Sequence, residues 1–73
     1  MVRGDSRGAL TEYERAVRLD PELGDDVYVR LGTLAREDDD PERTERYFRK
    51  ALELNAENPT ARQALAELAA SLG

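Results

Sequence analysis

The sequence predicts an all-α fold of four helices that form antiparallel hairpins and stack into a solenoid. Apolar residues recur at helical spacing in four separate segments of the 73-residue chain, and the sequence shows no strand-like alternation. The connections between these segments are about two to five residues long, which makes consecutive helices antiparallel. A similar pattern of residues also recurs at an offset of 35 positions, a period typical of helical solenoids.

The first helix is expected at about residues 6–19. Its apolar residues fall at the i, i+3, i+4 and i+7 spacing of a single helical face. Asp20-Pro21 ends the helix, because the residue before a proline avoids the helical conformation. The apolar face of this helix consists of Ala9, Leu10, Tyr13, Ala16 and Val17.

The second helix is expected at about residues 25–37. Asp25 and Asp26 are expected to supply its N-cap and to place negative charge at the positive end of the helix dipole. Gly32 lies in the middle of this helix, at a cost of about 1 kcal/mol relative to alanine. A glycine there indicates that another helix crosses very close to the backbone. The apolar face consists of Val27, Tyr28, Leu31, Leu34 and Ala35.

The third helix opens at Asp40-Pro41, with aspartate as the N-cap and proline at the first helical position. Its apolar face consists of Tyr47, Phe48, Ala51, Leu52 and Leu54. The fourth helix opens near Asn58-Pro59 and runs to about Leu72. Its apolar face consists of Ala61, Ala64, Leu65, Leu68, Ala69 and Leu72.

The recurring residues are small, aromatic and proline positions on equivalent helices. One copy consists of Ala9, Tyr13, Ala16 and Pro21, and the next of Thr44, Phe48, Ala51 and Ala56. In this pattern the sequence resembles the tetratricopeptide repeat family, in which an aromatic and Leu-Gly mark the first helix of each repeat. The residues that match that first helix are Tyr28, Leu31, Gly32 and Ala35, and those that match the start of a further repeat are Leu65, Ala66 and Ala69.

The resemblance implies a right-handed α-solenoid and divides a single domain, residues 1–73, into three parts. Residues 6–19 correspond to the second helix of a first repeat. Residues 25–58 correspond to one complete repeat, and residues 59–72 to the first or capping helix of a third. The sequence departs from the family pattern at Asp39, which occupies a turn position usually given to glycine, and aspartate tolerates positive φ better than most residues.

The composition argues against several classes of function. The chain has no cysteine and no histidine, so the commonest metal ligands and the commonest general base are missing. We therefore expect no enzyme activity, no metal site and no cofactor. The net charge of −5 disfavours binding to nucleic acid and to anionic membranes. No 18-residue apolar segment and no signal-peptide pattern is present, which favours a cytoplasmic location.

Charged side chains on the solvated helix faces are expected to form ion pairs one turn apart. The acidic run Asp38-Asp39-Asp40 does not fit a calcium-binding loop, because its sixth position is an arginine instead of glycine. We interpret this run as an acidic turn that caps a helix. The expected i, i+4 pairs are Glu14 with Arg18, Glu42 with Arg46, and Glu45 with Arg49.

The leading functional hypothesis is a protein-interaction scaffold. The resemblance implies that one face of the second helix and the equivalent face of the fourth line a concave groove that binds a peptide or helix of another protein. An ordinary solvated face is the alternative, but Val29, expected to be exposed among charges, favours binding. The ligand is expected to carry an acidic residue and an apolar anchor. The predicted groove residues are Asp26, Val29, Arg30, Thr33, Arg36, Glu37, Gln63 and Glu67.

Two other functions stay open. The first and fourth helices lack a neighbour on one side, so apolar residues at both ends should be only half covered, and two copies could cover each other as a homodimer or a larger assembly. The chain could also be a regulatory segment of an enzyme that lies outside this sequence. The residues predicted for self-association are Leu10, Tyr13, Val17, Leu65, Leu68 and Leu72.

Overall fold

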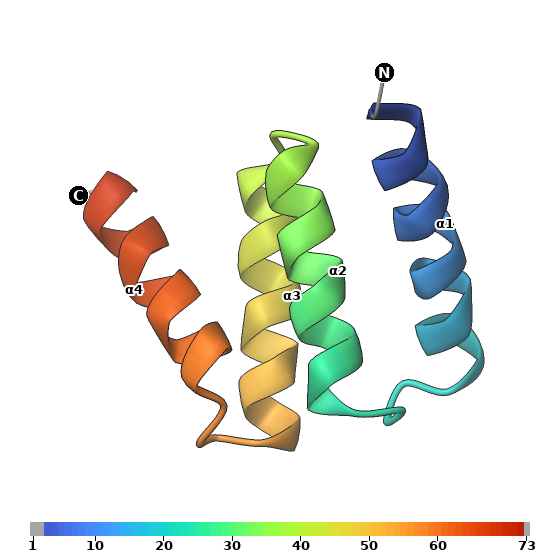
Figure 1. Ribbon diagram of the computed structural model, residues 1–73. Helices are drawn as coiled ribbons and strands as arrows, with labels where there is room; N and C mark the ends of the chain where they lie inside the picture. The colour runs from blue at the N-terminus through green and yellow to red at the C-terminus, as the bar shows by residue number, and fades with distance from the viewer. Residues whose placement is uncertain (1–2, 73) are drawn as a thin grey trace.

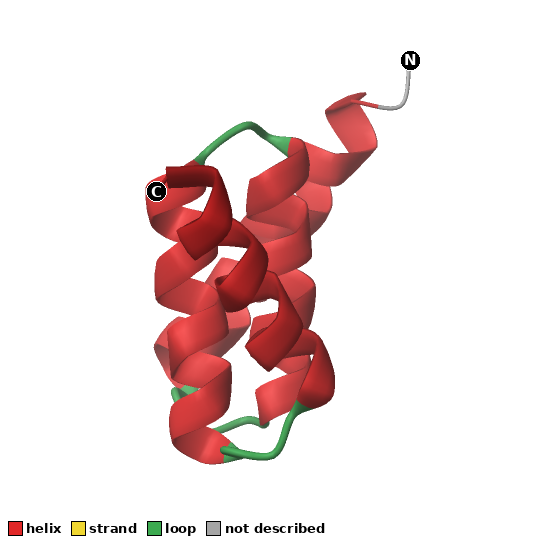
Figure 2. Cartoon of the chain, turned by 90° about the vertical axis from the view of Figure 1, so that its left-hand side faces the viewer, coloured by secondary structure: helices red, strands yellow, loops and turns green. Residues whose placement is uncertain are grey.

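The structure, a computed structural model, confirms the all-α fold. It describes residues 3–72, with side chains for residues 8–70. Within this range the helices run alternately in opposite directions, so each consecutive pair is an antiparallel hairpin (Figure 1). α4 lies at the opposite end of the row from α1 (Figures 1 and 2). The elements are α1 (Arg3–Leu19), α2 (Asp25–Glu37), α3 (Pro41–Leu54) and α4 (Pro59–Leu72).

The centre of the core lies between α2 and α3, which share the most extensive interface. The ring of Phe48 on α3 lies directly against Gly32 of α2, and a Cβ added to Gly32 would lie 2.7 Å from Phe48 Cε2. Leu31 and Ala51 lie in the same interface and are fully buried. The predicted close crossing of the second and third helices is therefore confirmed. Glycine is required at this position because the aromatic ring occupies the space of a side chain.

The two outer helices pack onto this central hairpin. Leu10 of α1, together with Ala61 and Ala64 of α4, belongs to the same apolar cluster as Phe48. Leu10 is only 5% exposed, so the prediction that it is half covered is wrong. The physical reason is that α1 contacts α3 as well as α2, since Glu14, one turn after Leu10, contacts α3 side chains.

The other residues predicted for the open ends differ in their burial. Tyr13 and Val17 of α1, and Leu65 and Leu68 of α4, are partly buried, which agrees with incomplete coverage at both ends. The side chain of Leu72 lies outside the described residues. Incomplete coverage is therefore found at both ends, but the uncovered apolar area on α1 is smaller than the sequence predicts.

The N-terminus of α2 differs from the prediction. Gly24, with φ 155°, is the N-cap residue, and no side chain in the described chain caps this helix. The Asp25 carboxylate lies within the first turn and accepts hydrogen bonds from Asn55 Nδ2 at 3.1 Å and Asn58 Nδ2 at 2.7 Å. Asp26 also lies within the first turn. The predicted aspartate N-cap is therefore wrong, because the Asp25 side chain instead binds the connection between α3 and α4.

The connections before α3 and α4 use side-chain caps. Asp40 Oδ1 accepts a hydrogen bond from the backbone N–H of Arg43 at 3.1 Å, as the sequence predicts. Asn58 Oδ1 accepts one from the backbone N–H of Ala61 at 3.0 Å and so caps α4. Asp39 has φ 62°, which confirms the left-handed turn expected at this position. These local interactions fix where α3 and α4 begin, and so where α4 crosses the central hairpin.

Candidate functional site

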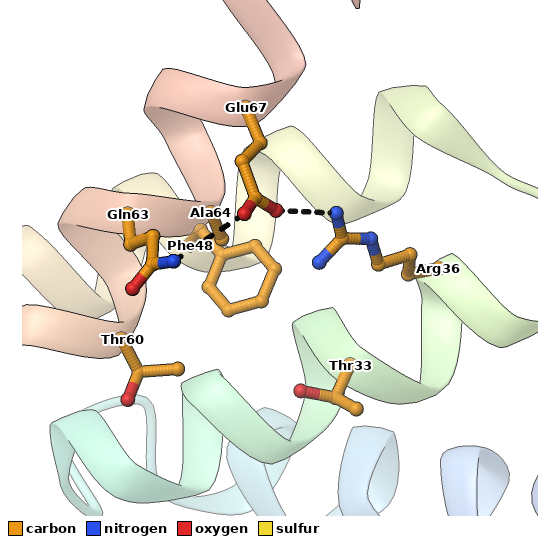
Figure 3. A pocket seen from close by; sticks show the side chains of 7 residues that line it. All are labelled: Thr33, Arg36, Phe48, Thr60, Gln63, Ala64 and Glu67. Atoms are coloured by element: carbon orange, nitrogen blue, oxygen red, sulfur yellow. Dashed lines mark hydrogen bonds and ion pairs between the residues drawn. The ribbon is translucent and has the colours of Figure 1, made fainter.

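A shallow depression of about 220 Å³ lies between α2 and α4. It forms because α3 packs against both helices and separates their outer faces. Figure 3 shows the ring of Phe48, from α3, between the side chains of the two bordering helices. The lining residues are Thr33 and Arg36 of α2, Thr60, Gln63, Ala64 and Glu67 of α4, and Phe48.

The floor of this depression is apolar and its rim is polar. Phe48 is 1% exposed and Ala64 is 5% exposed, so both lie at the bottom. The Thr33 hydroxyl donates a hydrogen bond to the carbonyl of Val29 at 2.9 Å, and its oxygen keeps a free lone pair for a ligand donor. Thr60 and Gln63 are exposed on the α4 side. An apolar floor with polar groups around it is the usual composition of a ligand-binding surface.

An ion pair crosses the depression and joins its two walls. Arg36 Nη2 lies 2.7 Å from Glu67 Oε1, and Gln63 Nε2 donates to Glu67 Oε2 at 3.4 Å (Figure 3). The hydrogen bond from Arg36, and then that from Gln63, lowers the pKa of Glu67 below its ordinary value. Glu67 is therefore ionised at neutral pH. Both partners of the pair are about half exposed, with side-chain values of 50% and 48%.

The depression brings together four of the predicted groove residues, namely Thr33, Arg36, Gln63 and Glu67. The other four, all on α2, do not line it. Asp26, Arg30 and Glu37 are exposed. Val29 is partly buried and packs against the apolar cluster, so the expectation that it is exposed is wrong.

The groove faces predicted from the sequence included Thr60 on the fourth helix, but they left out two of the lining residues, Ala64 and Phe48. Ala64 lies one turn from both Thr60 and Glu67, so helical spacing on α4 could have indicated it. Phe48 was assigned to the core alone. It belongs to both, because one side of its ring covers Gly32 while the ring also forms the floor of the depression.

Two kinds of site, a metal-binding cluster and a membrane-spanning helix, are not found among the described residues. Among residues 8–70, whose side chains the structure describes, no group of three or more acidic side chains is placed so that it could hold a metal ion. No helix in the described part of the chain is long and apolar enough to cross a membrane.

Comparison with known protein families gives a match over part of the chain. Residues 25–58 match the family described as Tetratricopeptide repeat. These residues begin at the first residue of α2 and end at Asn58, which caps α4. They are the same residues that the sequence pattern assigns to one complete repeat. No curated protein and no solved structure matches the chain.

Proposed function

We propose that this chain is a protein-interaction module that binds a peptide or helix between α2 and α4, because residues 25–58 match the tetratricopeptide repeat family. Tetratricopeptide repeats in general mediate protein–protein interaction. The observation that carries the more specific proposal is the depression between these two helices, with its apolar floor and polar rim. The module is proposed to act by binding alone and not as an enzyme.

The chemistry of the depression indicates which ligand it accepts. An apolar side chain of the ligand would lie over Phe48 and Ala64. The hydroxyls of Thr33 and Thr60 and the amide of Gln63 can exchange hydrogen bonds with a peptide backbone. These polar groups lie on both walls, so an extended or helical segment would lie along the depression instead of crossing it.

A carboxylate of the ligand would have to compete with Glu67 for Arg36. Exposed ion pairs contribute at most about 1 kcal/mol, so the exchange of one carboxylate for another at Arg36 costs little. The Arg36–Glu67 pair therefore does not block an acidic ligand, but it weakens binding by the amount needed to separate the pair. Replacement of Glu67 by a neutral residue is therefore expected to strengthen the binding of an acidic ligand.

The test uses a peptide selected by display against the isolated chain, with affinity measured by fluorescence anisotropy. For an acidic peptide, Glu67→Gln should strengthen binding several-fold, because Arg36 becomes free to meet the ligand. Replacement of Arg30 and Arg36 together by alanine should weaken binding, and more at low salt than at high salt, because exposed charges are screened over about 10 Å at 0.1 M. Of these two arginines only Arg36 lines the depression, so Arg36→Ala alone should account for most of the loss.

The matched control replaces Arg15 and Arg49 by alanine. Both are exposed, neither lines the depression, and the change in net charge is the same. Equal weakening in the two double variants would mean that overall charge, and not the depression, governs binding. Unchanged affinity of the Arg30 and Arg36 variant at low salt would remove these residues from the site.

Homo-oligomerisation is a second candidate, favoured by apolar side chains that stay uncovered. Leu19 is 88% exposed and Leu23 is 46% exposed, and Leu65 and Leu68 are partly buried at the other end. A second copy of the chain would bury this surface at about 25 cal/mol per Å². Sedimentation equilibrium over a range of concentrations tests the proposal. A folded monomer at every concentration would contradict it.

A further inference from the structure

A second depression, of about 340 Å³, lies between α1 and α3. We call it the arginine pocket. Its lining contains three arginines and one glutamate, a net charge of +2 in a chain whose net charge is −5. The lining residues are Glu14, Val17 and Arg18 of α1, and Arg43, Arg46 and Tyr47 of α3.

The one carboxylate in the arginine pocket is already bound. Glu14 Oε2 lies 3.1 Å from Arg43 Nη1, and the Tyr47 hydroxyl donates a hydrogen bond to the same oxygen at 2.7 Å. The predicted pair between Glu14 and Arg18 is therefore wrong, because Glu14 is turned toward α3. Burial, and next the hydrogen bond to Glu14, raises the pKa of Tyr47 to about 12, so this hydroxyl keeps its proton at neutral pH. These contacts hold Glu14 away from the remaining arginines.

Arg18 and Arg46 are left without a carboxylate partner among the residues that the structure describes. Both side chains are exposed, and they come from different helices to border the same depression. Val17 and the ring of Tyr47 are partly buried and pack against the apolar core, so they supply apolar surface between the arginines. Two free guanidinium groups beside an apolar surface fit a ligand that has carboxylates next to an apolar side chain.

We propose that the arginine pocket is a second protein-binding site that takes an acidic peptide segment, with Arg18 and Arg46 pairing its carboxylates and Val17 and Tyr47 contacting an apolar side chain. Guanidinium groups bind carboxylates through paired N–H donors, which gives geometric selectivity as well as attraction. A local positive patch on a negatively charged protein also orients an acidic partner toward this one place. A long polyanion such as nucleic acid would meet the negative charge of the rest of the surface.

The probe is the capped peptide Glu-Glu-Leu-Glu-Glu, titrated into the isotope-labelled full chain and followed through backbone amide shifts. The matched control peptide carries glutamine in place of each glutamate. We expect residues 14–18 and 43–47 to shift with the acidic peptide and not with the glutamine peptide. Replacement of Arg18 and Arg46 by glutamine should weaken binding about tenfold, because both carboxylate contacts are lost.

The control variant replaces Arg15 and Arg49 by glutamine. These two arginines lie on the same helices as Arg18 and Arg46 but outside the arginine pocket, and their replacement changes the net charge by the same amount. The control variant should therefore alter the affinity for the acidic peptide by no more than about twofold. Thermal melts of both variants establish that each is folded. Equal weakening in the two variants would overturn the proposal, as would shifts confined to α2 and α4. Inorganic phosphate that shifts the same amides as strongly as the peptide would show a simple anion site and overturn the peptide assignment.

Discussion

The contact between Gly32 and Phe48 predicts an unusual response to a mild substitution. In most helix interiors Gly→Ala is stabilising, because glycine costs about 1 kcal/mol relative to alanine. At Gly32 the added methyl carbon would lie 2.7, 2.8 and 2.9 Å from three atoms of the Phe48 ring. Carbon atoms in contact normally lie about 3.5–4.0 Å apart. The ring is 1% exposed and cannot move into solvent without opening the core.

The two contributions can be weighed against each other. Overpacking of this kind costs about 1–3 kcal/mol, which equals or exceeds the gain of about 1 kcal/mol in helix propensity. Gly32→Ala is therefore expected to change the free energy of unfolding by between zero and about 2 kcal/mol, in the destabilising direction. Gly32→Leu adds more volume at the same place and should be more destabilising.

Gly8→Ala is the matched control. Gly8 lies in α1, and beyond its chain neighbours and the nearby backbone of its own helix no heavy atom lies within 4 Å of the position of an added Cβ. This variant should gain about 1 kcal/mol. Thermal melts followed by circular dichroism should separate the two variants by at least about 4 °C, because 1 kcal/mol shifts the melting temperature of a domain this small by about 4–8 °C. A Gly32→Ala protein that melts as high as the Gly8→Ala protein would refute the packing argument.

Three further predictions concern the turns and the contact between α1 and α3. Asn58→Ala should lower the free energy of unfolding by about 1–2 kcal/mol in urea titrations, because Asn58 caps α4 and also donates to Asp25; a loss below about 0.5 kcal/mol would count against this double role. Folding raises the pKa of Tyr47 to about 12, so the tyrosine ionises in the unfolded state first and the free energy of unfolding falls as the pH rises from 10 to 12. Tyr47→Phe removes this ionisation and should reduce the loss of stability over the same range. Parallel melting curves of parent and variant across this range would contradict it. Asp39→Gly should raise the melting temperature by a few degrees, because glycine adopts φ 62° without the cost of a side chain, about 1 kcal/mol; an unchanged temperature would mean that the turn is not strained.

Much of the fold could be predicted because the responsible signals are local. The bounds of α2 agree with the expected residues 25–37, since the apolar face and the following turn are encoded within a few positions. The positive φ of Asp39 follows from its place in that turn. The cap of α2 could not be predicted, because the Asp25 carboxylate is bound by Asn58, which lies 33 positions away in the sequence.

The candidate site was also predictable only in part. The family register placed Thr33, Arg36, Gln63 and Glu67 on facing surfaces, and the structure brings these four together. Their pairing was not predictable, since the Arg36–Glu67 contact joins residues 31 positions apart and depends on how α4 crosses the central hairpin. Helical spacing in the sequence reliably indicates which side chains share a face of one helix. The choice of partner across two helices depends on packing that sequence spacing does not specify.

The central claim is that a peptide binds between α2 and α4. The most direct test is a backbone amide spectrum of the labelled chain with and without the display-selected peptide. We predict that the largest shifts occur at Thr33, Arg36, Gln63 and Glu67, with smaller effects at Phe48 below them. Shifts confined to the outer faces of α1 and α4, or line widths that rise with protein concentration without any peptide, would contradict the claim and favour self-association instead.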